Sequence, residues 1–174
     1  GQAKGLQLKR ADSASLRKAL GGSTAHLQFE VQWQAVELES QTKTGRWGVW
    51  GDADSVREEL EAAQVDFVAL KSFDEGLDAS IDGILSVWDE QAMCFEAANT
   101  QAQAGLAQLQ AFGGTKPLIW LTTNAVAATD TDSLSGVAGS VLFGLARTAR
   151  SENPDWTLVT ADGRGALQSV LANT

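Results

Sequence analysis

The chain has 174 residues, the length of one ordinary domain, and its hydrophobic content of 44% is enough to build a core. Thirteen basic and 22 acidic residues give a net charge of −9, which disfavours nucleic acid or an anionic membrane as a partner. One cysteine and one histidine exclude an internal disulfide and a zinc cluster with nitrogen and sulfur ligands. We find neither a long apolar run nor a secretory leader, and we expect a cytoplasmic protein.

The first 24 residues differ from the rest of the chain. They are rich in Lys, Arg, Ser and Gly, with little periodic apolar content before SASLRKAL at 13–20, and the GGST that follows is typical of a break. We interpret residues 1–24 as a linker or as the tail of an upstream domain, and residues 25–174 as the domain proper. The next stretch, HLQFEVQWQAV at 26–36, alternates apolar and polar side chains and predicts a half-buried strand.

From residue 46 onward, short apolar runs alternate with longer helical patterns. The predicted strands span 46–50, 65–70, 81–88, 117–123 and 156–162, and the predicted helical segments span 55–64, 91–112, 136–153 and 165–174. Asp54 or Ser55 is placed to cap the first helix, Gly113 and Gly114 to end the second, and Pro154 to close the third. Strands that alternate with helices of this length predict an α/β fold, with a mostly parallel sheet covered by helices on both faces.

The stretch GRWGVWGDADSVREEL at 45–60 has the layout of a dinucleotide-binding unit, with a strand, a glycine turn and the start of a helix. The dinucleotide fingerprint needs three glycines, for the turn, for close approach of the pyrophosphate and for helix packing. Here Gly48 and Gly51 are followed by Asp52 and Asp54, and no third glycine arrives. Two carboxylates at the mouth of a helix would repel a pyrophosphate, so we interpret this stretch as a degenerate structural turn without a cofactor.

Catalytic residues are also missing from the sequence. Short-chain reductases of the Rossmann type protonate a carbonyl substrate from a tyrosine that a lysine acidifies, and this chain contains no tyrosine. The motif Gly-x-Ser-x-Gly of serine hydrolases is absent too. His26 stands at the entry to the alternating strand, where we expect a surface or pairing role. We therefore assign no catalytic, cofactor-binding or metal residue to this chain.

Three further groups of residues have structural interpretations. A cluster of carboxylates at 74–82 lacks the spacing of a calcium loop and is expected to be a solvated acidic face. Met93 and Cys94 are predicted to pack in the core, since no basic neighbour would lower the pKa of the thiol. The tryptophans are expected to pack in the core or at domain interfaces. They are Trp33, Trp47, Trp50, Trp88, Trp120 and Trp156.

Several stretches, taken together, resemble a known family. They are FEVQWQAV, RWGVWGDAD, IDGILSVWD, KPLIWLTTNAVA and GSVLFGLARTARSENPDWTLVTADG. In this order they are similar to the structural, non-catalytic subdomain of the ketoreductase of modular polyketide synthases, over residues 27–174. The most specific part is LFGLARTARSENPDWTLVTAD, which holds the family's residues Gly144, Leu145, Arg147, Arg150, Glu152, Pro154 and Asp162. The upstream GLQLKRADSASLRKAL is similar to the tail of a dehydratase, which often precedes this domain.

The resemblance implies a truncated Rossmann-like fold that has lost its cofactor site. Such a subdomain braces a second, catalytic ketoreductase subdomain that binds NADPH, within a synthase that also uses phosphopantetheine. The expected partners are that catalytic subdomain and adjacent synthase domains. Whether the partner reductase is active or degenerate, and whether it follows directly or after an enoylreductase, stays open.

A second hypothesis comes from a different class. The chain could be a self-sufficient α/β protein that binds a nucleotide or small molecule at the strand ends near Gly51, Thr122 and Asn124, where such sheets bind ligands. Saturable nucleotide binding would favour this hypothesis, and a folded chain without a ligand would favour the scaffold. The scaffold hypothesis also predicts exposed tryptophan or apolar surface at the strand 27–36 and at the sheet edge.

Overall fold

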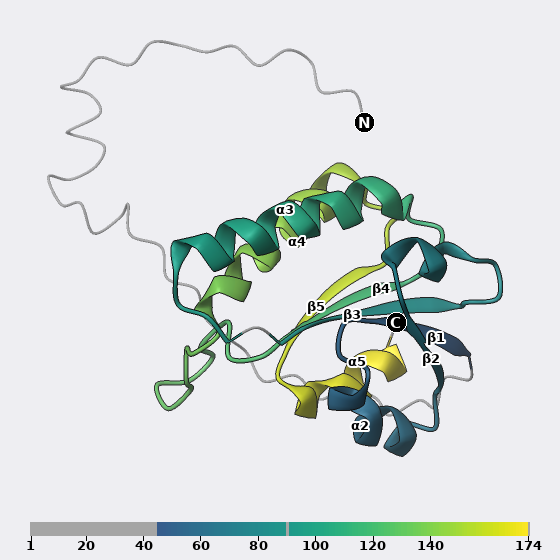
Figure 1. Cartoon of the computed structure of the whole chain (residues 1–174), viewed down its shortest axis with the longest axis horizontal. Coiled ribbons are helices and arrows are strands. Elements are labelled where there is room, and N and C mark those ends of the chain that lie inside the picture. Colours follow the sequence, from purple (N-terminus) through teal and green to yellow (C-terminus); the bar gives the residue numbers. More distant parts are fainter. Residues whose placement is uncertain (1–44, 90, 174) are drawn as a thin grey trace, which may run out of the picture. The chain divides into compact units, whose positions relative to one another are not determined.

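The computed structural model describes residues 45–89 and 91–173, and these residues form a five-stranded parallel sheet (Figure 1). The strand order is β2-β1-β3-β4-β5. The strands are β1 (Arg46–Trp50), β2 (Asp66–Leu70), β3 (Gly83–Trp88), β4 (Leu118–Thr122) and β5 (Leu158–Asp162). Each lies within a segment predicted as a strand. The α/β class and the parallel sheet are therefore confirmed.

The order of the strands reverses at β1. Val49 of β1 lies opposite Ala69 of β2 on one side and opposite Leu85 of β3 on the other. The chain thus builds the sheet in one direction from β1 to β2, and in the other from β3 to β5. In sheets of this kind, ligands bind outside the carboxyl ends of the strands at the point of reversal. The edge beside β1 and β3 is therefore the place to look for a site.

Helices cover both faces of the sheet, as the alternating pattern predicts (Figure 1). On one face lie α2 (Arg57–Ala62) and α5 (Leu167–Asn173), whose Leu60 and Leu167 are fully buried with Leu85 of the sheet. On the other face lie α3 (Phe95–Phe112) and α4 (Ser140–Glu152), whose Phe112 and Leu142 pack with Trp120. Burial of each such side chain stabilises the fold by about 1.5–3 kcal/mol.

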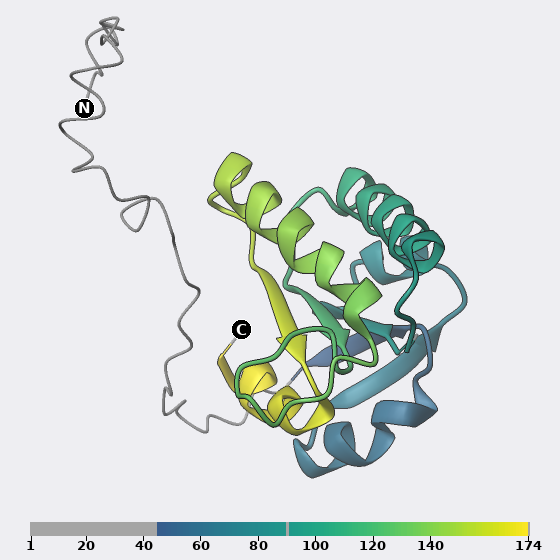
Figure 2. The ribbon, with the colours of Figure 1, turned by 90° about the vertical axis from the view of Figure 1, so that its left-hand side faces the viewer.

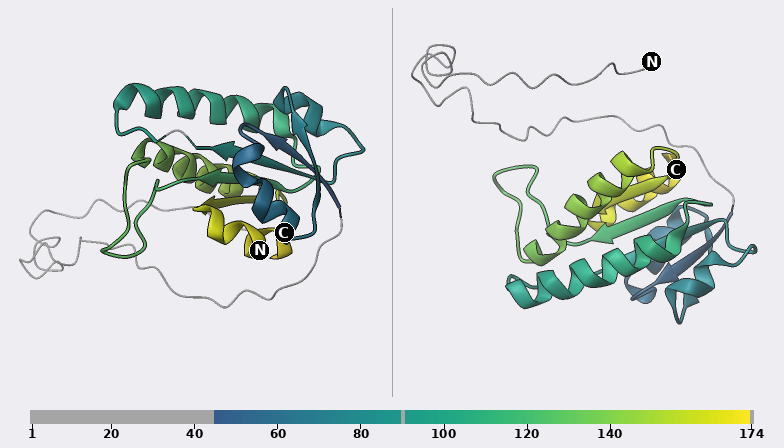
Figure 3. Two further views of the ribbon diagram at one scale, coloured as in Figure 1. Left: turned by 60° about the horizontal axis from the view of Figure 1, so that its bottom comes forward. Right: turned by 90° about the horizontal axis from the view of Figure 1, so that it is seen from above.

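The helices α3 and α4 lie side by side (Figures 2 and 3). Gly105 of α3 permits this close approach, because a Cβ atom there would lie 2.7 Å from Cδ2 of Leu142 on α4. Behind these helices, the ring of Trp88 lies 5.2 Å from that of Trp50 and 6.0 Å from that of Trp120. Trp88 and Trp120 are buried and Trp50 is half-buried, so the expected core packing holds for most of this cluster.

All four α-helices begin later than predicted. The predicted helix 55–64 is split into a 3-10 turn, Asp54–Val56, followed by the short α2. The predicted helix 91–112 begins only at Phe95, because Ala92 is held by a hydrogen bond from the Ala138 N–H to its carbonyl. Its end at Gly113, with a left-handed φ of 63°, is as predicted. Further 3-10 turns span Phe73–Leu77, Val137–Gly139 and Arg164–Ala166.

The late start of α3 overturns the prediction for Met93 and Cys94. Met93 is 73% exposed and Cys94 is also exposed, whereas core packing was expected for both. Both residues precede the first residue of α3, so neither belongs to the helix face that packs on the sheet. The strand 26–36 with His26 and Trp33, and the segment 1–24, lie outside the described residues. Within the described part, no helix has the length and apolar character needed to cross a bilayer.

Candidate functional site at the strand ends

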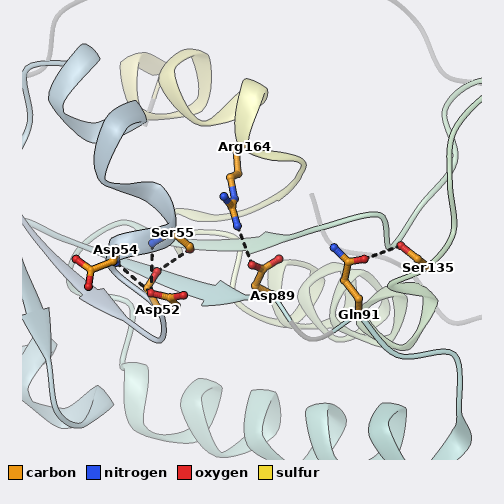
Figure 4. A network of polar contacts seen from close by, with 7 residues as sticks. All are labelled: Asp52, Asp54, Ser55, Asp89, Gln91, Ser135 and Arg164. Atoms are coloured by element: carbon orange, nitrogen blue, oxygen red, sulfur yellow. Dashed lines mark hydrogen bonds and ion pairs between the residues drawn. The ribbon is translucent and has the colours of Figure 1, made fainter.

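The carboxyl ends of β1, β3, β4 and β5 meet at one edge of the sheet, beside the reversal of strand order. Figure 4 shows the polar side chains that gather there from the loops after these strands. They include two of the four residues of the predicted degenerate turn, Asp52 and Asp54, with their neighbour Ser55, and also Asp89 and Arg164. The geometry of each loop decides which groups are free to contact a ligand.

The turn after β1 depends on a glycine. Gly51 has a φ of +99°, and a Cβ atom at this position would lie 2.5 Å from the carbonyl oxygen of Val87 on β3. A side chain is therefore excluded both by the backbone conformation and by contact with the neighbouring strand. Gly48 lies earlier, inside β1, where the side chain of Leu70 covers it. The two glycines thus serve the turn and the packing of the sheet.

The carboxylate of Asp52 occupies the start of the helical segment after this turn. Its Oδ1 accepts hydrogen bonds from the backbone N–H groups of Asp54 (3.1 Å) and Ser55 (3.2 Å). The Ser55 hydroxyl donates back to the carbonyl of Asp52 at 2.7 Å. The prediction that Asp54 or Ser55 provides the cap is therefore wrong, since Asp52 takes that role. Asp54 instead pairs with Arg57 at 2.6 Å, and this hydrogen bond raises the pKa of the Arg57 guanidinium.

An ion pair links the loops that follow β3 and β5. Nη2 of Arg164 lies 2.8 Å from Oδ2 of Asp89 (Figure 4). The second carboxylate oxygen, Oδ1 of Asp89, is buried and accepts no hydrogen bond from the described residues. Both side chains are partly exposed, at 40% and 28%, so the pair is worth at most about 1 kcal/mol. Its position is more informative than its strength, because it joins two strand ends that a ligand at this edge would approach.

The loop after β4 is held by Asp162, at the end of β5. Its carboxylate accepts hydrogen bonds from the Thr122 hydroxyl at 2.7 Å and from the backbone N–H groups of Ala125 and Val126 at 3.1 Å. Thr122 is buried, with 1% of its surface exposed. The sequence marked Asp162 only as part of a family motif. Its structural role is to hold the loop after the neighbouring strand β4, and no local sequence pattern predicts this role.

Asn124 belongs to a second chain of contacts in the same loop. Its φ is +56°, and its side-chain amide donates a hydrogen bond to Oγ of Ser135 at 3.1 Å. The Ser135 hydroxyl in turn donates to Oε1 of Gln91 at 3.0 Å (Figure 4). The three residues named for a ligand site lie at two strand ends, Gly51 after β1 and Thr122 and Asn124 at the end of β4, and all three are engaged in contacts within the chain.

The carboxylates at 74–82 do not converge on a common point. They bind backbone N–H groups nearby: Glu75 accepts from Lys71, Asp78 from Ser80 and Asp82 from Arg46. The contacts with Ser80 hold the pKa of Asp78 below its usual range. No group of three His, Cys, Asp or Glu side chains among the described residues could hold a metal ion.

The chemistry available at this edge is limited. The hydroxyls of Ser55 and Thr122 donate to a carbonyl and to a carboxylate, and the described residues contain no histidine that could act as a base. The Thr122 hydroxyl does lie next to a carboxylate, but the side chain is buried and cannot reach a substrate. The described residues of this edge stabilise four loops, and none of them is a nucleophile that a neighbouring base activates.

Comparison with known proteins gives the family. Residues 31–174 match the family described as the Rossmann fold domain of polyketide synthase extender module SpnB. A PKS-NRPS hybrid synthetase, acdB, from Aspergillus candidus is 29% identical over 145 residues, which cover 77% of this chain. The chain spans only 6% of the length of that relative.

Two solved structures share the fold. A C2-type ketoreductase from a modular polyketide synthase aligns with a TM-score of 0.61 at 23% identity, over 82% of this chain and 38% of that one. An A1-type ketoreductase aligns with a TM-score of 0.56 at 24% identity, over 80% of this chain and 36% of that one. The family match covers most of the sequence, the sheet and helices agree with it, and the chain belongs to the Rossmann fold domains of polyketide synthase extender modules.

Proposed function

We propose that this chain is a non-catalytic structural subdomain of a polyketide synthase reducing module, and that it braces a catalytic, NADPH-dependent ketoreductase subdomain or its neighbours. One observation carries the proposal. The backbone N–H groups of Asp54 and Ser55, which face the place of a phosphate in a dinucleotide-binding turn, already bind the carboxylate of Asp52. An anionic phosphate would have to displace this carboxylate, and a second carboxylate, Asp54, lies beside it in an ion pair with Arg57. NADPH therefore does not fit this turn.

The rest of the strand-end edge supports the same proposal. The sequence has no tyrosine to protonate a carbonyl substrate. The charged groups of this edge are bonded within the chain. Arg164 pairs with Asp89, and Asp162 accepts hydrogen bonds from Thr122 and Ala125. A site that uses its polar groups to hold its own loops is suited to rigidity, which is what a bracing subdomain needs.

A scaffold also needs a surface on which its partner can rest. A groove formed by α3, α4 and the segment after α4 is lined by Leu106, Leu109, Leu145 and Trp156, together with polar side chains. Leu106 is 47% exposed, while Leu145 and Trp156 are half-buried. We infer that the catalytic subdomain rests on this groove. Apolar side chains that are partly exposed in a groove are stabilised when a partner covers them.

The alternative is a self-sufficient nucleotide-binding protein, favoured by the strand order, which places a reversal point at the edge where such proteins bind ligands. Isothermal titration calorimetry with NADPH separates the two. We expect no heat of binding with the 174-residue chain, and saturable binding with a chain extended into the sequence that its gene encodes next. Saturable binding by the 174 residues alone would refute the scaffold proposal.

The same extended chain tests the groove. Leu106→Asp should lower the thermal midpoint of the catalytic subdomain, because it places a charge in the apolar contact. Gln103→Asp, an exposed position on the same helix, is the matched control and should leave that midpoint unchanged. Equal effects of the two variants would place the contact elsewhere.

A further inference from the structure

The strand β2 forms one edge of the described sheet, and the backbone directions show which of its groups point outward. The Arg46 carbonyl accepts a hydrogen bond from the Asp82 N–H, on the β3 side of β1. The backbone groups of the next residue, Trp47, therefore point to β2, where Phe67 lies opposite in the register. In a parallel pair the opposite residue points away, so the N–H and C=O groups of Phe67 and Ala69 face outward.

These outward groups are open. Among the residues that the structure describes, neither Phe67 nor Ala69 has a hydrogen-bond partner on this side. Lys71, which faces the same way, differs, because Oε2 of Glu75 accepts a hydrogen bond from its N–H at 2.8 Å. Residues 67–70 contain neither proline nor a charged side chain, the usual protection of an edge strand. The edge therefore offers two donors and two acceptors to another strand.

The opposite edge of the described sheet, β5, is protected. The Thr157 carbonyl accepts a hydrogen bond from the Leu118 N–H on the inner side, so Leu158 and Thr160 face outward. Arg150 of α4 donates a hydrogen bond from Nη1 to the Leu158 carbonyl at 3.2 Å. A further strand would have to displace this guanidinium before it could pair with β5. Of the two edges, β2 is therefore the better suited to bind another strand.

The side chains along this edge indicate what kind of strand fits. Val68 and Leu70 are half-buried and line a groove beside the edge. A negative charge stands at the first residue of β2, where the Asp66 side chain is 76% exposed and only loosely paired with Arg46, at 3.8 Å. A positive charge, the exposed Lys71, follows its last residue. An antiparallel partner with the same sequence would place opposite charges beside each other at both ends.

We propose that β2 pairs in antiparallel fashion with β2 of a second copy of this chain, so that two five-stranded sheets become one continuous sheet. A two-fold axis perpendicular to the sheet relates the copies and keeps Val68 and Leu70 of both on one face. Lys71 of each copy lies beside Asp66 of the other. A contact of one short strand buries little surface, so we expect a dissociation constant of about 0.1 mM.

Sedimentation equilibrium of the full chain, from about 10 µM to about 1 mM, tests the contact. Ala69→Pro removes an outward N–H and no hydrogen bond to β1, so it should raise the dissociation constant about tenfold or more while the fold persists. Thr160→Pro makes the same change at the outward side of β5 and should leave the dissociation constant unchanged. Circular dichroism checks that both variants are folded.

A charge exchange tests the antiparallel arrangement without a proline. Lys71→Glu and Asp66→Lys each place like charges at both ends of the paired strands, and each should raise the dissociation constant about tenfold. An equal mixture of the two variants again has opposite charges at both ends of a mixed dimer. We therefore expect the mixture to associate within about twofold of the wild-type dissociation constant.

Several results would overturn the proposal. One is a wild-type chain that stays monomeric up to about 1 mM. Another is a dimer that Ala69→Pro leaves intact or that Thr160→Pro weakens equally, since the contact would then lie elsewhere. A mixture of Lys71→Glu and Asp66→Lys that associates no better than either variant alone would exclude the antiparallel pairing. None of these results depends on whether the chain binds NADPH.

Discussion

Gly51 and Gly113 both have a left-handed backbone, with φ values of +99° and +63°, but only Gly51 is also crowded. A Cβ atom at Gly51 would lie 2.5 Å from the Val87 carbonyl, whereas nothing lies within 4 Å of one at Gly113. Gly113→Ala should therefore cost about 1 kcal/mol of unfolding free energy for backbone strain alone. Gly51→Ala adds a backbone clash and should cost about 3 kcal/mol or more. Urea unfolding of the two variants measures this difference. Equal losses of unfolding free energy would show that β3 shifts to make room for the methyl group at position 51.

The sequence did not predict the roles of residues whose hydrogen-bond partners lie far away along the chain. The glycine turn after β1 was predicted because glycine and aspartate mark turns locally. The bonds of Asp162 to Ala125 and Val126 cross 36 or more positions, and no local pattern signals them. The cap was assigned to Asp54 or Ser55 from their place before the helix, yet the turn at Gly51 brings Asp52 to the free N–H groups.

At the scale of elements, Lys116 ties the loop after the Phe73–Leu77 turn to the start of β4. Its ammonium group donates hydrogen bonds to the carbonyls of Gly76 (3.2 Å), Asp78 (2.7 Å) and Ile81 (2.7 Å). Lys116→Met keeps most of the side-chain length but leaves three carbonyls without this donor, and should lower the unfolding free energy by about 2 kcal/mol. Lys71→Met, an exposed position in the same region, is the control and should change it by less than about 0.5 kcal/mol. Similar losses in both would show that water replaces the ammonium group.

The loop at 128–132 has its own response to pH. The carboxylate of Asp132 accepts hydrogen bonds from the N–H groups of Thr129 and Ala128, both at 2.8 Å, and these bonds lower its pKa. A lowered pKa in the folded state means that the loop is stabilised above the ordinary aspartate value of about 3.9 and loses that stability as pH falls below it. The amide NMR signals of Ala128 and Thr129 should therefore shift only below about pH 3.9. In Asp132→Asn this titration should vanish, and a midpoint above that value would contradict the contacts.

Strands were easier to predict than helix ends. Buried parallel strands form continuous apolar runs, and all five described strands lie within predicted ones. The start of α3 was placed four residues early, because QAMC has acceptable helix propensity and the contact between Ala92 and Ala138 is tertiary. That error placed Met93 and Cys94 in the core, whereas both are exposed.

For the whole molecule, alternation of strands and helices indicated the α/β class, but not the order β2-β1-β3-β4-β5, since strand order depends on how the crossovers pack. At the candidate site, too, the sequence predicted local features but not contacts between distant residues. The two aspartates beside Gly51 argued against a phosphate, while the ion pair of Asp89 with Arg164 joins positions 75 residues apart. The sequence therefore predicted the turn at Gly51, but not the contacts between distant residues that hold this edge together.

The net charge of −9 makes a prediction for the whole molecule. Excess negative charge destabilises a compact state by self-repulsion, and salt screens that repulsion. We expect the unfolding free energy, measured in urea because urea is uncharged, to rise by about 1 kcal/mol between low salt and 0.5 M NaCl. Glu58→Gln/Glu61→Gln, which removes two exposed charges from α2, should raise the low-salt value and weaken the salt dependence. A fall in stability with salt would show that ion pairs such as Arg164 with Asp89 outweigh the general repulsion.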